Sequence, residues 1–453
     1  MLRQIICFIT LIGTSIAVAV PVKSMLGAFN SQICKEVEPE IPVGTATWGF
    51  YVKALEPHSS VSMRTFYNNG SSDRSPEINL EYSIDAGNTW NPFVVGETTI
   101  VLPSTGKKCF FRAGEAGNTC FARVSNGSPS YCQGANVFSF TGKVAIGGNI
   151  MSLMHHVENE SDAMFMPPFA TPRDYTDRRF NRLFMADWSS NKSSYSAPDS
   201  TALVDAHLLI IPNLRLTAAL SYTCVYGYMF AGCKGLVVGP QLSEENLTHH
   251  IYRNMFYSCS SLAIAPELPS LKLAQGCYAG MFERCTSLTL PPELPATALQ
   301  SECYNGMFRS CASLRVAPTL PSTNAAPYCY QNMFLECTSL VNSPELPAVT
   351  LATDCYRSMF SACTSLMTAP ALPATNLTTR CYREMFRGCS KIDKISVGFI
   401  DPTLFESSCY YWLYGVKSTG IFECYSTLGT SETIERGVSA CPANWSVVNT
   451  DSE

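Results

Sequence analysis

The chain has 453 residues, of which 46% are apolar and only 15% are charged, and its formal net charge is −5. This composition excludes a disordered polymer and a coiled coil, and the charge offers no long-range attraction for phosphate, so we expect no nucleic-acid partner. The 21 cysteines are too dilute for a short disulfide scaffold, which leaves their positions to be explained.

The first nineteen residues have the pattern of a secretory signal peptide. Arg3 precedes an apolar run from Ile5 to Val20, and Ala17-Val18-Ala19 fits a small-x-small cleavage site. The run is shorter than the roughly 20 residues that span a bilayer, although an uncleaved anchor helix is the alternative. We therefore expect export, with residues 1–19 as the signal, 20–45 as a leader or linker, and no membrane span after cleavage.

Residues 46–150 are expected to form a small antiparallel β-sandwich. Short β-rich runs are separated by Asn-Gly, Asp-Ala-Gly and Ser-Thr-Gly turns, and no useful helical period interrupts them. The predicted strands lie in the runs Trp48–Lys53, Ile78–Ile84, Thr98–Leu102 and Lys108–Arg112.

One turn in this region resembles the Asp-box of sialidases, S-x-D-x-G-x-x-W. The match runs from Ser83 to Trp90 and occurs once, whereas the resemblance would imply a hairpin element repeated on several propeller blades, without a catalytic role. Asp85 and Gly87 suit a tight turn with Trp90 packed beneath it. We interpret this motif as structural.

Residues 151–224 are predicted to hold an N-terminal cap and a split first repeat. Phe180-x-x-Leu183-Phe184 and the stretch from Leu203 to Pro212 look like the two parts of one copy. The Ser-rich stretch between them, roughly residues 186–202, is expected to be an exposed loop. Atypical terminal copies are typical of repeat arrays, because they must cover the open edge of the core.

Seven Met-Phe pairs, each 26 residues after the last, mark residues 225–406 as a repeat array. The unit reads C-Y-x-x-M-F-x-x-C-x-S-L-x-x-x-P-x-L-P, and the copy from Cys277 to Glu302 shows it whole. We number the positions of every copy from this first residue. A fixed period between 20 and 50 residues indicates a solenoid, in which each copy depends on its neighbours for burial. The pairs begin at Met229, Met255, Met281, Met307, Met333, Met359 and Met385.

Each copy divides into two halves. Positions 1, 5, 9 and 12 fall within about 80° of one another at 100° per residue, which predicts one face of a short helix or of helical turns. The proline at position 16 prevents continuation of the helix, and the leucines after it indicate an extended arm. The tyrosine at position 2 of all seven copies is a candidate either for packing or for binding sugar or peptide.

The repeat cysteines are best explained as buried thiols. The two in one copy would lie about 12 Å apart along a helix, beyond the roughly 7 Å Cα limit of a disulfide. Position 1 is Val225 and Ile251 in the first two copies and Cys afterwards, so it behaves as an apolar core position. Disulfides between copies are the alternative, since an exported protein permits oxidation.

No motif points to catalysis, a metal or a cofactor. The chain has no C-x-x-C, H-E-x-x-H, nucleophile elbow or phosphate loop, so we expect a protein that is not an enzyme. The six histidines are expected to be ordinary surface or cap residues: His58, His155, His156, His207, His249 and His250.

The repeat unit resembles the BspA-like leucine-rich repeats of bacterial surface proteins, whose consensus has an Ile, an Ala-Phe pair and then Gly-Cys-x-x-Leu. The C-Y-x-x-M-F-x-x-C-x-S-L form with a Leu-Pro arm looks like a variant of Bacteroidetes-type proteins. Residues 407–453 look like a degenerate eighth repeat, with Cys409-Tyr410 and Leu413-Tyr414, followed by a C-terminal cap. The resemblance implies an α+β class: the β-sandwich-like domain, then a right-handed leucine-rich-repeat solenoid of short strands and helical turns with terminal caps.

The expected function is non-catalytic: a secreted or cell-surface protein that presents the solenoid for protein–protein interaction or adhesion. Its partners would be host or bacterial surface and matrix proteins, with glycans as a further class, and the sequence sets no oligomeric state. The alternative is a glycan-binding or glycan-hydrolysing protein that acts through the N-terminal β domain.

The expected interaction face lies beside the repeat proline, where positions 13 and 17 vary while the inward positions hardly vary. Seven copies at a strand spacing of about 4.8 Å give a face roughly 30 Å long, enough for a standard protein contact, and its low charge argues against electrostatic capture. The face comprises Val237, Ala263, Thr289, Arg315, Val341 and Met367 at position 13, and Gln241, Glu267, Glu293, Thr319 and Glu345 at position 17.

Overall fold

The protein is known as a computed structural model that describes residues 49–67, 77–118, 121–124, 132–153, 182–186, 200–210, 224–242, 247–437 and 439–450. The chain divides into two compact units, Met1–Thr47 and Trp48–Glu453. The predicted signal peptide (1–19), the linker (20–45) and most of the predicted loop at 186–202 lie outside the described residues. Within the described ranges, no helix has the length and apolar character needed to cross a membrane.

The N-terminal strands form two sheets, and the four predicted runs each contain a strand. One sheet has the order β10-β9-β1-β6-β3-β4 and the other has the order β5-β2-β8-β7. All neighbouring pairs are antiparallel except β9 and β10. The strands are β1 (Phe50–Ala54), β2 (Ser59–Tyr67), β3 (Leu80–Ser83), β4 (Asn91–Phe93), β5 (Thr99–Leu102), β6 (Lys108–Ala113), β7 (Ala122–Val124), β8 (Cys132–Thr141), β9 (Val144–Asn149) and β10 (Leu203–Ile210).

Aromatic rings join the two sheets. The Phe138 ring of β8 lies 5.4 Å from that of Phe50 on β1 and 5.3 Å from that of Phe111 on β6. All three side chains are buried, so the alternation of large apolar residues on these strands forms one core between the sheets. The described strands of this region are thus β-rich as expected, and one parallel pair, β9 with β10, joins the antiparallel ones.

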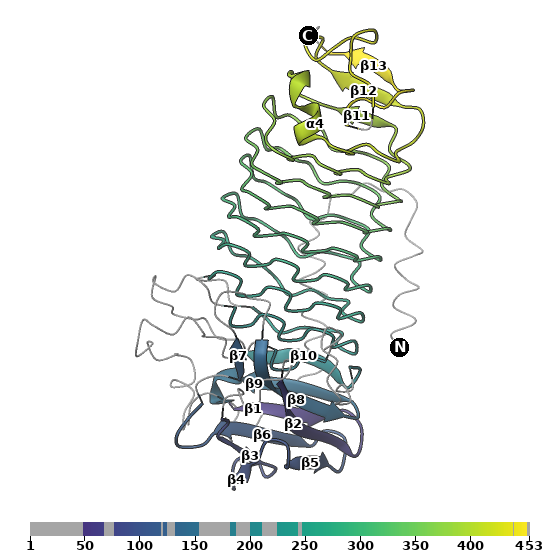
Figure 1. Ribbon diagram of the computed structural model, residues 1–453. Coiled ribbons are helices and arrows are strands. Elements are labelled where there is room, and N and C mark those ends of the chain that lie inside the picture. Colours follow the sequence, from purple (N-terminus) through teal and green to yellow (C-terminus); the bar gives the residue numbers. More distant parts are fainter. Residues whose placement is uncertain are drawn as a thin grey trace, which may run out of the picture. The chain divides into compact units, whose positions relative to one another are not determined.

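The six-stranded sheet continues directly into the repeats (Figure 1). Strand β10 pairs in parallel with β9, and Asp205 of β10 forms a parallel bridge with Val238, which in turn bridges Ile264. On another side, the Phe184 N–H donates to the Met229 carbonyl at 2.9 Å. The β strands therefore cover the first end of the repeat array.

Each 26-residue copy forms one coil, and one segment of every coil is a run of turns. We call this segment, from position 26 of one copy through position 9 of the next, the turn side; in one coil it is Gly276–Cys285. Every second N–H donates to the next coil, as from Tyr278 to the Cys303 carbonyl at 3.1 Å. The alternate N–H groups donate three residues back, as from Met281 to Tyr278 at 3.2 Å.

Of the two predicted alternatives, a short helix or helical turns, these segments are turns. A left-handed residue occurs every fourth position, with φ of 57° at Gly276, 63° at Gly280 and 64° at Arg284. These residues interrupt the i to i−4 bonding of an α-helix and turn the intervening N–H groups toward the neighbouring coil. The residues expected to face inward do so, because a period of four residues also places positions 1, 5 and 9 on one side. In the described ranges the only α-helix is α4 (Phe405–Ser408), so the fold is β-rich.

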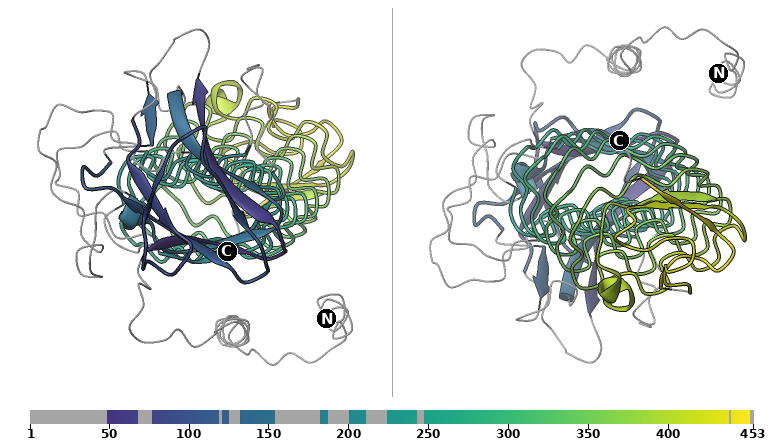
Figure 2. Two further views of the ribbon diagram at one scale, coloured as in Figure 1. Left: turned by 90° about the horizontal axis from the view of Figure 1, so that it is seen from below. Right: turned by 90° about the horizontal axis from the view of Figure 1, so that it is seen from above.

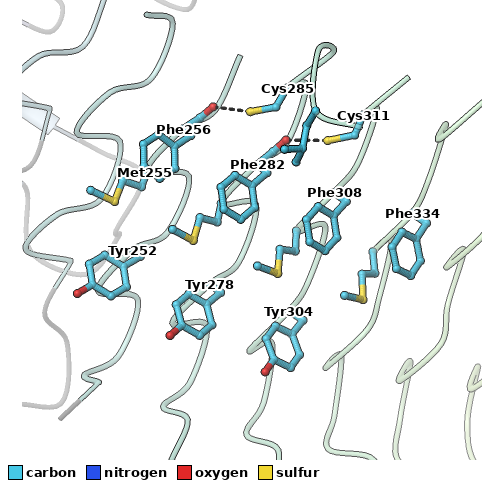
Figure 3. Packing of buried hydrophobic residues seen from close by; sticks show 14 of the residues in the cluster. Tyr252, Met255, Phe256, Tyr278, Phe282, Cys285, Tyr304, Phe308, Cys311 and Phe334 are labelled. Carbon is cyan, nitrogen blue, oxygen red and sulfur yellow. Dashed lines mark hydrogen bonds between the residues drawn. The ribbon is translucent and has the colours of Figure 1, made fainter. Parts of the chain in front are cut away.

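Identical side chains stack from coil to coil inside the array (Figure 3). Phenylalanine rings at position 6, from Phe230 to Phe386, have centroids 5.5 to 5.8 Å apart and lie within 9° of parallel. Tyrosine rings at position 2, from Tyr252 to Tyr382, stack at 5.6 to 6.0 Å. Viewed end on, successive coils overlap, each displaced slightly sideways from the one before (Figure 2). The tyrosine at position 2 is thus a core residue, which answers the choice between packing and ligand binding.

The C-terminal end departs from the predicted register by one residue. The Phe386 N–H donates to the Trp412 carbonyl at 2.8 Å, so Trp412-Leu413, and not Leu413-Tyr414, stands in the Met-Phe place. Two 3-10 segments occur in the described residues, η1 (Ile150–Leu153) and η2 (Pro402–Leu404). A parallel sheet closes the array: β11 (Lys394–Ser396), β12 (Ile421–Cys424) and β13 (Ser446–Asn449).

Candidate interaction surface

The predicted face lies on the remaining part of each coil, positions 10–25, which we call the arm side. All residues named for positions 13 and 17 are exposed except Val237, which is half-buried. Backbone bonds align position 13 in a row, from Met367 N–H to the Val341 carbonyl at 2.9 Å and from Arg315 N–H to the Thr289 carbonyl at 3.4 Å. The backbones of these position-13 residues are therefore hydrogen-bonded between neighbouring coils, so their side chains lie side by side along the array.

The residues at the neighbouring position 14, which the sequence pattern did not identify, are also part of this surface. Leu290 is 52% exposed and Val316 is 54% exposed, beside Val341 at 37% and Met367 at 55% in the next two coils. Large apolar side chains are thus exposed on four successive coils. The signal that could have found them is the variation of position 14, which runs Val238, Ile264, Leu290, Val316, Asn342, Thr368.

Charge is distributed unequally between the two sides of the coils. The turn side carries ion pairs between neighbouring coils, such as Arg380 with Asp354 at 2.7 Å and Arg309 with Glu283 at 3.8 Å. Hydrogen bonding to the buried Asp354 carboxylate raises the pKa of Arg380, and burial raises the pKa of Glu283. The arm side has mainly hydroxyl, amide and apolar side chains around isolated charges such as Glu293.

The repeat thiols are buried, and the structure separates them into two kinds. At position 9 each Sγ donates to the phenylalanine carbonyl of the preceding coil, as from Cys285 to Phe256 at 3.1 Å and from Cys311 to Phe282 at 3.0 Å. Burial raises the pKa of Cys277, at position 1, to about 12. Such thiols are poor nucleophiles, because the thiolate is the reactive form. The repeat cysteines from Cys233 to Cys409 are all free thiols in the structure.

The Asp-box turn uses its carboxylate internally. Asp85 accepts hydrogen bonds from the Ser83 hydroxyl at 2.6 Å, the Thr89 N–H at 2.9 Å and the Thr89 hydroxyl at 2.6 Å. These bonds lower the pKa of Asp85 to about 2, so it stays ionised as the anchor of the turn. Trp90 lies beneath the Arg112 guanidinium, 4.2 Å from the ring centroid. The geometry is that of a structural turn, as the motif predicts.

The surroundings of the histidines differ along the described ranges. His207 Nδ1 lies 2.7 Å from an Asp205 carboxylate oxygen, and His250 is buried within the array. No group of three His, Cys, Asp or Glu in those ranges is arranged to hold a metal ion.

Comparison of the chain with protein-family models, with curated proteins and with solved structures finds no match. Function is therefore inferred from the surface that the coils present.

Proposed function

We propose that this chain is a non-catalytic, exported surface protein of the BspA-like leucine-rich-repeat type, and that its coils form a solenoid which binds a protein partner through positions 13, 14 and 17. The observation that carries this proposal is the row of exposed, variable residues on the arm side. Inside the same coils, Tyr, Met, Phe and the Cys of position 9 are the same in all seven copies, and the Cys of position 1 and the Leu of position 12 change only to other apolar residues.

The physical reason lies in how each coil is held. Backbone bonds and stacked rings on the turn side fix the distance between coils, so arm residues can change without loss of the core. Seven coils at a spacing of about 4.8 Å give a row roughly 30 Å long, which suits a standard interface. Exposed side chains such as Leu290, Val316 and Met367 supply apolar area at its centre.

The test uses the full chain and four immobilised matrix proteins: fibronectin, fibrinogen, laminin and collagen. A variant with Glu at Ala263, Thr289, Val341 and Met367 should lose at least tenfold in binding, because four charges would have to be desolvated at the interface. The matched control places Glu at four exposed residues of position 21: Thr297, Thr323, Val349 and Thr375.

The control should bind as the unmodified chain does, and both variants should keep its circular dichroism spectrum. Equal loss in the two variants would contradict a specific face. Absence of binding to all four probes by the unmodified chain would contradict the adhesive function proposed for host matrix.

A second candidate is glycan binding by the N-terminal β domain. Its supporting observation is a row of aromatic and cationic side chains on the six-stranded sheet, with Lys108 Nζ 4.1 Å from the Tyr51 ring centroid and Arg112 over Trp90. If the arm variant binds normally while Trp90→Ala abolishes binding, this candidate replaces the first.

A further inference from the structure

The turn side of the last coil differs from that of the coils before it. Hydrogen bonds align Tyr410 with position 3 and Tyr414 with position 7, since Glu384 N–H donates to the Tyr410 carbonyl at 2.9 Å and Gly388 N–H to the Tyr414 carbonyl at 2.7 Å. Tyr411 stands between them at position 4. In the complete coil before it, these positions are Arg383, Glu384 and Arg387. Three tyrosines thus occur together where polar residues precede them.

The three rings form a continuous aromatic surface. The centroids of Tyr410 and Tyr411 are 4.4 Å apart, and those of Tyr411 and Tyr414 are 5.3 Å apart. Their planes are inclined by 54° and 46°, so the rings present faces at different angles. Tyr414 is 50% exposed, and the other two are half-buried.

Closure of the core does not require these tyrosines. Trp412 is fully buried at the end of the array, and its indole N–H donates to the Ala440 carbonyl at 3.0 Å. Leu413 is buried beside it. The Trp412 ring lies 6.3 Å from that of Tyr382, the last tyrosine of its stack, so the end of that stack is covered without the surface tyrosines.

Charged groups lie against the rings and are already oriented. The Arg383 guanidinium lies 5.3 Å from the Tyr410 ring centroid. Arg383 Nε and Arg387 Nη1 each donate to a different oxygen of Glu384, both at 3.2 Å. The Glu384 carboxylate therefore holds two guanidiniums beside the aromatic surface, and the Arg387 side chain is 51% exposed.

We propose that Tyr410, Tyr411 and Tyr414, with Arg383, Glu384 and Arg387, form an oligosaccharide-binding site. A pyranose ring has an apolar C–H face that packs on tyrosine, and hydroxyls that exchange hydrogen bonds with guanidinium and carboxylate groups. Aromatic surface beside a few fixed polar groups is the general composition of a small-molecule site. Arg383 and Arg387 are balanced by Glu384 and by Glu406, whose charge acts on Tyr410, so the site carries little net charge and favours a neutral or weakly charged sugar over a polyanion.

This site lies on the turn side and is independent of the protein contact proposed for the arm side. The experiment titrates the full chain by affinity electrophoresis with maltohexaose, cellohexaose, mannohexaose, chitohexaose and hexagalacturonate. We expect at least one neutral oligosaccharide to retard the unmodified chain. The double variant Tyr410→Ala, Tyr414→Ala should bind it at least tenfold more weakly, and Arg387→Gln should also weaken it.

Tyr425→Ala is the matched control, because Tyr425 is a 42% exposed tyrosine of the C-terminal region that lies outside the ring contacts of Tyr410, Tyr411 and Tyr414. It should bind within twofold of the unmodified chain. Tyr414→Phe keeps the ring and should retain most of the binding, which separates stacking from damage to the coil. Retardation by none of the five sugars, by hexagalacturonate alone, or to the same extent by the double variant would overturn the proposal.

Discussion

The turn side and the arm side of one coil obey different rules, although both belong to the same 26 residues. On the turn side, every second N–H reaches the next coil and the rings repeat without exception. On the arm side, the coils are joined by isolated bridges such as Asn342 with Thr368, and the exposed residues vary. Regular bonding therefore fixes the geometry along one side and leaves the other side available for recognition.

The largest effect should come from alkaline pH, which attacks the buried ladders together. Burial raises the pKa values of Cys277, Cys355 and Cys389 to about 12, whereas an unfolded thiol ionises near 8.5. The unfolded state therefore binds fewer protons above that pH, and the stability present below it is lost as pH rises toward about 12. Circular dichroism should show cooperative unfolding in this interval, together with the appearance of thiolate absorbance. Thiolate absorbance that grows with the fold intact would contradict the prediction.

Loss of one ring from the turn side should be the most costly single change. Phe308→Ala removes a fully buried ring that stacks on Phe282 and Phe334, and should lower the free energy of unfolding by about 3–5 kcal/mol. The arm-side control Val316→Ala, in the same coil, should change it by less than about 0.5 kcal/mol because Val316 is largely exposed. Urea denaturation measures both, and comparable losses would remove the distinction between the sides.

A smaller difference in stability should separate alanine substitutions at two glycines that have left-handed backbone conformations. Both Gly276 and Gly306 have positive φ, 57° and 61°, so alanine costs about 1–2 kcal/mol at either site. A Cβ at Gly276 would also collide with the His250 ring, whereas one at Gly306 would meet nothing within 4 Å. Gly276→Ala should therefore be the more destabilising by a further 1–2 kcal/mol or so in thermal unfolding. Equal melting temperatures would indicate that His250 moves away freely.

The smallest predicted difference concerns the two cysteine positions. Cys303→Val should cost less than about 1 kcal/mol, because Val225 and Ile251 occupy position 1 in other coils. Cys311→Val should cost about 1 kcal/mol more, since it removes the thiol that donates to the Phe282 carbonyl. The difference in urea midpoint between the two variants measures the value of the thiol bond. A reversed order would show that packing volume alone governs both positions.

The sequence was sufficient for the repeat and its inward residues, but not for the backbone of the turn side. Periods of 3.6 and of four residues place Cys277, Met281 and Cys285 on one face alike, so the pattern could not tell a helix from a run of turns. The left-handed positions are occupied by residues as different as Glu302 and Tyr328, and neither residue type indicates a positive φ. The thiol bond at position 9 was hidden because cysteine is also an ordinary core residue.

Two further features depend on contacts distant in the chain. The parallel pairing of β10 with β9 joins segments separated by more than fifty residues, and local β pattern does not specify such a partner. The exposed position-14 residues Leu290 and Val316 look like core residues by composition, and apart from the variation of that position it is the stacked coils that show them facing outward. The sequence pattern also did not identify the tyrosine cluster of the last coil, because one extra residue shifts the register of that coil relative to the repeats.

That shift has a consequence for how the chain can change in length. Inside the array, the inter-coil hydrogen bonds of the turn side lead to a residue 25 positions ahead, as from Tyr356 to Cys381, so an insertion of one residue would misalign both flanking coils. At Trp412 the extra residue is accommodated where no further complete coil follows. Within the array, insertions and deletions should therefore occur in whole units of 26 residues. Single-residue insertions and deletions should collect at its end, where they can change the surface without disturbing the stacked rings.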